Sequence, residues 1–271
     1  MADIALTDAA QVRTAVSERY AAAAKGGGCC SPSQGSGCCD DAAPADTSVG
    51  VRYYSAEEVA GLEQDVAGFS LGCGNPIAFA KPQEGETVLD LGSGGGLDCF
   101  ISSKFVGPTG HVIGVDMTPA MLERARNAAE RMGITNVEFR EGLIEALPVA
   151  DNSVDLVISN CVINLSTDKD AVFQEAFRVL KPGGRLVVSD IVTSHDLPPA
   201  IKRDLELWAG CIAGALPEEE YTLKMAKAGF EQVAPLARST YVDDELAQKV
   251  PNSGPHGPIY SLKVRAYKPV A

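Results

Sequence analysis

The sequence predicts an α/β fold built on a doubly wound, mostly parallel sheet. From Thr87 onward, short apolar strands alternate with helical patterns. A glycine loop, "VLDLGSGGG" at Val88–Gly96, joins the first of these strands to the first helix. The composition, 45% hydrophobic and 22% charged, is that of a folded globular protein. Strands that alternate with helices make right-handed crossovers, which place the strands parallel in one sheet.

Five strands and three connecting helices account for the central region. The strands are expected at Thr87–Leu91, His111–Asp116, Val137–Glu141, Val154–Ser159 and Arg185–Ile191. The helices are expected at Leu97–Phe105, Thr118–Met132 and Lys169–Leu180, and "KPGG" at Lys181–Gly184 is expected to turn into the last strand.

The flanking segments predict an N-terminal extension and a C-terminal cap. A helix at Asp8–Lys25 precedes a polar, cysteine-rich segment that we expect to be a mobile loop. Helices at Pro199–Ala215, which carries Cys211, and Glu218–Ala228 precede an edge hairpin of Gln232–Val242 and Ile259–Tyr267. We therefore divide the chain into residues 1–50 with the Cys-rich loop, a cofactor domain at 51–192 that includes the Cys73 segment, and a cap with edge strands at 193–271.

Charge and composition restrict the partners. The formal net charge of −13 argues against nucleic acid and anionic membranes. Neither a membrane-spanning run nor a signal peptide is evident, so we expect a cytoplasmic protein, and a monomer. A reducing cytosol disfavours a disulfide framework, which leaves metal or metalloid binding, redox chemistry or core packing for the 8 cysteines.

The glycine loop predicts the cofactor. Gly92, Gly94 and Gly96 allow a tight turn and close approach of the backbone to a ligand, and Asp116 ends the next strand, where an acid accepts hydrogen bonds from ribose. A nicotinamide site requires a third glycine at the position of Leu97, and Asp90 favours a ligand with an ammonium group. S-adenosylmethionine therefore fits better than a dinucleotide.

Position distinguishes the cysteines. Cys161 follows the strand Val154–Ser159, at the sheet edge that faces the ligand crevice. Cys73 lies in a glycine-rich turn, and Cys211 lies beyond the last parallel strand. Cys99, on the first crossover helix, is predicted to be core packing.

Six motifs carry a resemblance to a known family: "SLGCGNP", "VLDLGSGGG", "GVDMTPAML", "SNCVINLS", "FRVLKPGGRLVVSDI" and "WAGCIAGAL". Between about Tyr53 and Gly229 the chain resembles the arsenite methyltransferases of the bacterial and archaeal type. The resemblance implies a class I S-adenosylmethionine methyltransferase, Rossmann-like fold. It also implies a cofactor site at Asp90, Gly92, Gly94, Asp116, Met117, Ile144 and Asn160, with Leu143 and Ile144 in the adenine-side loop "GLIEALP".

The same resemblance implies that Cys73, Cys161 and Cys211 bind arsenic(III). Trivalent arsenic is soft, prefers thiolates and takes three ligands in a pyramid, which leaves a lone pair to attack the methyl group. Zinc would require a fourth ligand. No general base is needed, so His111, His195 and His256 are predicted to be structural or superficial.

Methylation formally oxidises arsenic, and a disulfide that forms between cysteines returns two electrons. Cys29, Cys30, Cys38 and Cys39 are candidates, with Cys30 preferred as the fourth functional cysteine; the alternative is a disordered tail. Substrates would be arsenite and methylarsenite, with a thiol reductant such as glutathione or thioredoxin. The rival functions are a methyltransferase for another small molecule and a thiol protein that binds metalloids without turnover.

Overall fold

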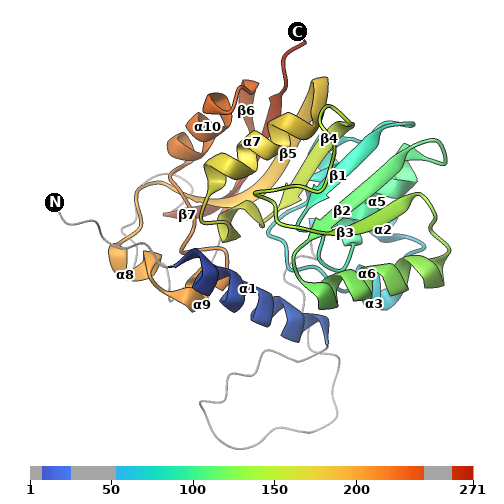
Figure 1. Ribbon diagram of the computed structural model, residues 1–271, viewed down its shortest axis with the longest axis horizontal. Helices are drawn as coiled ribbons and strands as arrows, with labels where there is room; N and C mark the ends of the chain where they lie inside the picture. The colour runs from blue at the N-terminus through green and yellow to red at the C-terminus, as the bar shows by residue number, and fades with distance from the viewer. Residues whose placement is uncertain (1–7, 26–52, 241–257, 271) are drawn as a thin grey trace, which may run out of the picture.

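A seven-stranded sheet forms the centre of the computed structural model, which describes residues 8–25, 53–240 and 258–270 (Figure 1). The strand order is β3-β2-β1-β4-β5-β7-β6. Strands β1 to β5 pair with one another in parallel, whereas β7 is antiparallel to both β5 and β6. The strands are β1 (Thr87–Leu91), β2 (His111–Asp116), β3 (Val137–Glu141), β4 (Val154–Asn160), β5 (Leu180–Thr193), β6 (Glu231–Thr240) and β7 (Ile259–Tyr267).

Helices cover both faces of the sheet, because neighbouring strand residues point to opposite sides. Val88 packs in a cluster with residues of α5 and α6, while Leu89 packs in a second cluster with residues of α7 and α10. The longer helices are α1 (Ala9–Ala24), α5 (Leu97–Val106), α6 (Pro119–Met132), α7 (Lys169–Val179) and α10 (Glu218–Lys227). The short ones are α2 (Ala56–Val59), α3 (Gln64–Ala67), α4 (Ile77–Ala80), η2 (Ile163–Leu165), α8 (Pro199–Lys202) and α9 (Leu205–Ala209).

Helix α1 lies apart from both layers. It contacts α6, α9 and η2, and so it spans one end of the sheet from the α6 side to the α9 side (Figure 1). Val12 and Val16 are its buried residues, and they belong to a small cluster that also contains Cys73, Cys161 and Cys211. The N-terminal helix therefore closes the end of the molecule that carries these cysteines.

Most predicted elements are confirmed, with two corrections. Strands β1, β2 and β3 begin and end at the predicted residues, and β6 and β7 form the predicted edge hairpin. The predicted turn at Lys181–Gly184 is wrong, because this segment is part of β5 and carries an irregularity in its pairing with β4. The predicted helix at Pro199–Ala215 is also wrong, because it is broken into α8 and α9 and ends before Cys211.

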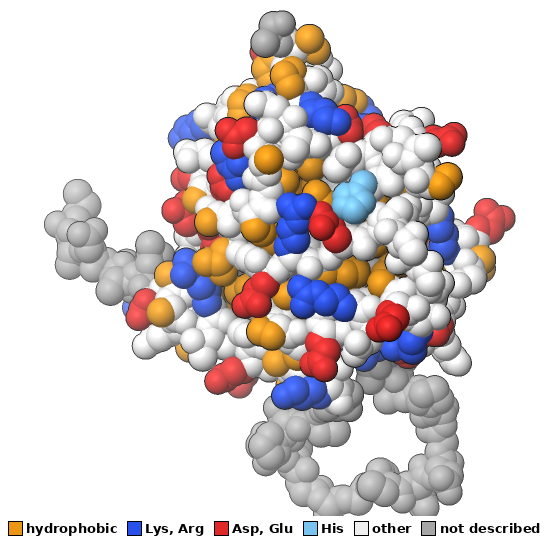
Figure 2. Space-filling model, turned by 45° about the vertical axis from the view of Figure 1, so that its right-hand side comes forward, with side chains coloured by type: hydrophobic (Ala, Val, Ile, Leu, Met, Phe, Trp, Pro, Cys, Tyr) orange, Lys and Arg blue, Asp and Glu red, His pale blue; other side chains and the backbone are white. Residues whose placement is uncertain are grey.

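Acidic and basic side chains are interspersed with hydrophobic ones on the face that Figure 2 shows. Within the described parts of the chain, no helix is both long and apolar enough to cross a membrane.

Candidate active site

A cavity lies beside the carboxyl ends of β1, β2 and β4. The sheet order reverses between β1 and β4, which is where doubly wound folds bind their ligands. Most of the predicted cofactor residues line this cavity: Asp90, Gly92, Gly94, Asp116, Met117, Leu143, Ile144 and Asn160. Gly96 does not line it. It is the N-cap of α5, and a Cβ there would lie 2.8 Å from the Phe100 ring, so Gly96 serves packing.

The cavity is acidic, which fits a cationic ligand. Asp90, Asp98 and Asp116 line it and are 2%, 8% and 8% exposed. Among the described residues, none of the three forms an ion pair with a lysine, arginine or histidine. Burial raises the pKa of Asp98 to about 6, and burial followed by repulsion from Asp98 raises the pKa of Asp90. An ammonium or sulfonium group would offset this cost, so the residues fit S-adenosylmethionine.

Asp116 holds the glycine loop against β2. Its carboxylate accepts the Gly94 N–H at 2.9 Å and the Thr118 N–H at 2.8 Å. At the start of the loop, Gly92 has φ of 66°, and a Cβ there would lie 2.3 Å from a Val162 methyl carbon. Only glycine fits that turn. The predicted acceptance of ribose hydroxyls by Asp116 would use its remaining lone pairs.

Asn160 connects the cavity to the Cys73 segment. Its side-chain oxygen accepts the Cys73 N–H at 3.1 Å, and its amide nitrogen donates to the Gly74 carbonyl at 2.8 Å. The same nitrogen lies 3.0 Å from the Tyr54 hydroxyl, which donates to Asp98 at 2.7 Å. Sequence reasoning missed Tyr54 and Asp98, and no motif pointed to Tyr54.

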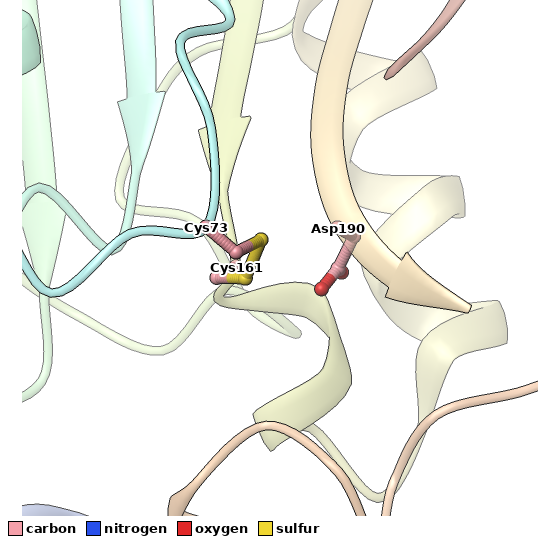
Figure 3. Close-up of side chains that lie close together, drawn as sticks. All are labelled: Cys73, Cys161 and Asp190. Atoms are coloured by element: carbon pink, nitrogen blue, oxygen red, sulfur yellow. A yellow bond between two sulfur atoms is a disulfide. The ribbon is translucent and has the colours of Figure 1, made fainter. Parts of the chain in front are cut away.

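The three predicted cysteines lie next to one another, and one of them, Cys161, forms part of the cavity wall. Cys73 and Cys161 are joined by a disulfide with their Cα atoms 5.8 Å apart (Figure 3). The Cys211 thiol donates to the Cys161 carbonyl at 2.9 Å. Cys161 itself lines the cavity. These side chains come from the segment before α4, from the end of β4 and from the turn after α9, so only the folded chain brings them together.

Two of these cysteines have unusual backbone conformations. Cys161 has φ of 63° and Cys211 has φ of 66°, which is the left-handed region. A side chain costs about 1–2 kcal/mol there. Cys211 is therefore not helical, and it lies in a turn two residues past the end of α9. Strained residues of this kind persist where the surrounding fold fixes them, commonly at functional sites.

Asp190 is a neighbour of the disulfide that sequence reasoning missed. It lies on β5, is 1% exposed, and its carboxylate oxygen and both disulfide sulfurs lie within 4.8 Å of one another (Figure 3). Tyr221 donates to it at 3.1 Å, and burial raises its pKa to about 7. Burial also raises the pKa of the Cys211 thiol to about 12, with a smaller contribution from Asp190. An acid near the end of the apolar strand "RLVVSDI" was the available signal.

Helix α1 contributes a second set of missed residues. Arg13, Val16 and Tyr20 line the cavity. The Tyr20 hydroxyl lies 3.8 Å from the Cys211 sulfur. Phe69 also lines the cavity and lies outside the quoted motifs, whereas the following lining residues lie inside those motifs but were not assigned to the site: Ser70, Leu71, Thr118, Met121, Glu145 and Leu165.

The remaining predicted positions lie away from the cavity wall or outside the described residues. Cys99 is fully buried among apolar residues, as predicted, but its thiol also donates to Asp90 at 3.3 Å. His111 lies 3.3 Å from Glu138 at the far end of β2. Cys30, with Cys29, Cys38, Cys39 and His256, lies outside the described residues.

Comparison with known proteins identifies the family. Residues 82–229 match the model of a methyltransferase domain. The chain is 38% identical to an arsenic(III) S-adenosylmethionine methyltransferase from Chlamydomonas reinhardtii, with a TM-score of 0.70, over 84% of this chain and 75% of that one. The chain belongs to the arsenite methyltransferase family.

Relatives of this family differ from the chain in length. The arsenite methyltransferase of Halobacterium salinarum is 46% identical over 88% of this chain and 62% of its own length. The human arsenite methyltransferase is 41% identical over 73% of this chain and 53% of its own length. The chain therefore spans about half to three fifths of the curated relatives that it matches.

Proposed function

We propose that the protein transfers a methyl group from S-adenosylmethionine to trivalent arsenic bound by cysteine thiolates. The observation that carries this proposal is that Cys73 and Cys211 both contact Cys161, which lines an acidic cavity. Thiolates are the ligands that soft trivalent arsenic prefers, and three of them complete its pyramid. The family of the chain supports the same substrate class.

The methyl donor, when bound, supplies an electrophilic methyl group on a sulfonium. The chain's own residues bind and orient the reactants: Asp90 and Asp98 would face the cationic part, and Asp116 the ribose. Cys73, Cys161 and Cys211, in their reduced form, would hold arsenic with its lone pair free to attack the methyl group. Alignment of nucleophile and methyl is the main catalytic contribution, because arsenic held as a thiolate complex carries no proton to remove.

The disulfide between Cys73 and Cys161 supports the redox half of the proposal. Methyl transfer uses the arsenic lone pair and formally raises arsenic to the pentavalent state. Two thiolates that join as a disulfide give up two electrons, which return arsenic to the trivalent state. A thiol reductant such as glutathione or thioredoxin must then reopen the disulfide, which suits a reducing compartment such as the cytoplasm. Methylarsenite would be a further substrate, and Cys30 a further thiol in the exchange.

A methylation assay on reduced protein with arsenite and methyl-labelled S-adenosylmethionine tests the proposal. We expect labelled methylarsenicals from the parent chain, none from Cys161→Ser, and near-parent yield from the matched core variant Cys99→Ala. Both variants should remain folded by circular dichroism. Methyl transfer only to another acceptor would favour a different small-molecule methyltransferase, and arsenite binding without transfer would favour a sequestering protein. Loss of arsenite binding in Cys99→Ala but not in Cys161→Ser would reverse the cysteine assignment.

A further inference from the structure

Lys263 is a buried cation close to the Cys73–Cys161 disulfide. It lies on β7, is 5% exposed, and forms no ion pair with any carboxylate in the described residues. Its ammonium donates instead to the Ser261 hydroxyl at 2.9 Å and to the Ser239 hydroxyl at 3.0 Å. A buried charge is costly without an opposite charge nearby. The position therefore suits an anion that forms only in another state of the protein.

Ser261 joins this cation to Cys73. Ser261 and Lys263 are two residues apart on one strand, so their side chains share a face. The Ser261 hydroxyl donates to the Cys73 carbonyl at 3.0 Å, and its oxygen lies 3.9 Å from the Cys73 sulfur. A small rotation would redirect the hydroxyl proton from the carbonyl to that sulfur. The ammonium of Lys263 lies behind the same hydroxyl.

The two sulfurs of the disulfide have different surroundings. Cys161 lines the cavity, whereas Cys73 is not among the residues that line it. The Cys73 sulfur faces strands β5 and β7 instead, 3.8 Å from the Ser189 carbonyl oxygen. A reductant that enters the cavity therefore meets Cys161 first, and Cys73 becomes the leaving sulfur.

We propose that Lys263 and Ser261 are positioning residues that stabilise the Cys73 thiolate when a dithiol attacks Cys161 from the cavity. A thiolate of the dithiol forms a bond to the Cys161 sulfur, the Cys73–Cys161 bond breaks, and its electron pair leaves on Cys73. The second thiolate of the dithiol then displaces Cys161. The dithiol loses two electrons to become a disulfide, and the protein disulfide gains them. This inference rests on the proposed function only in requiring the disulfide to be reopened in each cycle.

Stabilising the leaving thiolate accelerates exchange and favours the reduced form. Arsenic is not needed for this step, so reduction can be measured by itself. The oxidised full chain is mixed with dithiothreitol, and the appearance of Cys73 and Cys161 thiols is followed by quenched alkylation and mass spectrometry. We expect reduction to slow at least tenfold in Lys263→Met and less in Ser261→Ala, with most of the rate restored in Lys263→Arg. If Lys263→Met makes the equilibrium constant for reduction of the Cys73–Cys161 disulfide tenfold smaller, the reduction potential of this disulfide falls by about 30 mV.

Lys268→Met is the matched control, because Lys268 follows the same strand but donates to the Phe177 and Leu180 carbonyls. The disulfide of Lys268→Met should be reduced at the same rate as that of the parent chain. An unchanged rate in Lys263→Met would overturn the proposal, and if that variant does not fold, an unchanged rate in Ser261→Ala would do so. Failure of the proposed function would be seen separately: the parent chain would not methylate arsenic, while the expected rates of disulfide reduction in the parent and the variants would still be found.

The direction of attack is tested with single thiols. Cys73→Ser leaves Cys161 free, and Cys161→Ser leaves Cys73 free. An aromatic disulfide probe should form its mixed disulfide faster with Cys161 than with Cys73. The reverse order would show that the reductant reaches Cys73 first. The proposed assignment of Cys73 as the leaving sulfur would then be wrong.

Discussion

At the scale of the residue, Asp98 is the carboxylate that most directly couples ligand binding to pH. Burial raises its pKa to about 6, while hydrogen bonds from Tyr54 and Asn160 act in the opposite direction. A cationic ligand favours the charged form. At pH 5 the charged form costs about 1.4 kcal/mol to generate, since one pKa unit corresponds to that energy. We therefore expect S-adenosylmethionine to bind about tenfold more weakly at pH 5 than at pH 7.5, with a proton released on binding near pH 6.

Calorimetric titration in two buffers of different ionisation enthalpy measures both the affinity and the released proton. Asp98→Asn should flatten the pH dependence, leaving the part due to Asp90, whose pKa is also raised. Without ligand the raised pKa means that the folded state holds the proton more tightly than the unfolded state. Stability then falls as pH rises from about 4 to 6, so Asp98→Asn should raise the melting temperature at pH 8. If the affinity of the parent chain for S-adenosylmethionine does not change with pH, Asp98 is not the carboxylate that couples binding to pH.

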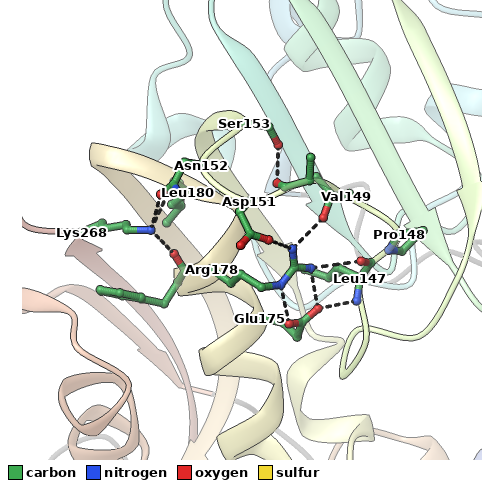
Figure 4. Close-up of polar contacts among 12 residues, drawn as sticks. Leu147, Pro148, Val149, Asp151, Asn152, Ser153, Glu175, Arg178, Leu180 and Lys268 are labelled. Atoms are coloured by element: carbon green, nitrogen blue, oxygen red, sulfur yellow. Dashed lines mark hydrogen bonds and ion pairs between the residues drawn. The ribbon is translucent and has the colours of Figure 1, made fainter.

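At the scale of the element, one arginine positions the loop that joins β3 to β4, and part of this loop lines the cavity. Arg178 on α7 donates to the Leu147 and Val149 carbonyls and pairs with Glu175 and Asp151 (Figure 4). Glu175 in turn accepts the Leu147 N–H at 2.7 Å. The preceding residues of this loop, Gly142 to Glu145, line the cavity. Arg178 thus connects α7 to the predicted adenine side.

We expect Arg178→Ala to raise the dissociation constant of S-adenosylmethionine about three- to tenfold, because the loop loses two charge-assisted hydrogen bonds and becomes mobile. Titration calorimetry checks this value. Arg131→Gln is the control, since Arg131 pairs with Glu63 and Asp65 at the surface, and it should leave affinity and melting temperature unchanged. Equal effects of the two substitutions would show that Arg178 is not specific to the loop.

The same scale explains what could be predicted from the sequence. Strands β1 and β2 were predictable as short, mostly apolar runs, and β3 as a run in which apolar and charged residues alternate. The break between α8 and α9 was missed because Asp204, expected inside a helix, caps α9 by accepting the Glu206 and Leu207 N–H groups. Cys161 and Cys211 could be selected by position and motif. Asp190 had a positional signal near the end of "RLVVSDI", but Lys263 had none, because its proximity to Cys73 arises from pairing between β5 and β7, which no local pattern specifies.

At the scale of the whole molecule, the N-terminal region contains two parts that must be tested separately. Helix α1 lines the cavity through Arg13, Val16 and Tyr20, so a truncation of residues 1–45 would damage ligand binding as well as remove four cysteines. Its alanine-rich sequence gave no sign of this role. The informative variant keeps α1 and replaces Cys29, Cys30, Cys38 and Cys39 by serine.

We expect this four-serine variant to transfer one methyl group normally when reduced protein is in excess over methylarsenite. Two thiolates, from Cys161 and Cys211, complete the pyramid of an arsenic that already carries one carbon. Repeated turnover should fall at least tenfold, because electrons from the reductant no longer pass through the N-terminal thiols. Cys211→Ser should fail even in the single transfer. Rapid-quench analysis of labelled product measures both regimes. If the four-serine variant turns over like the parent, the N-terminal cysteines have no redox role, and the attack on Cys161 from the cavity is made by the external reductant without a thiol relay.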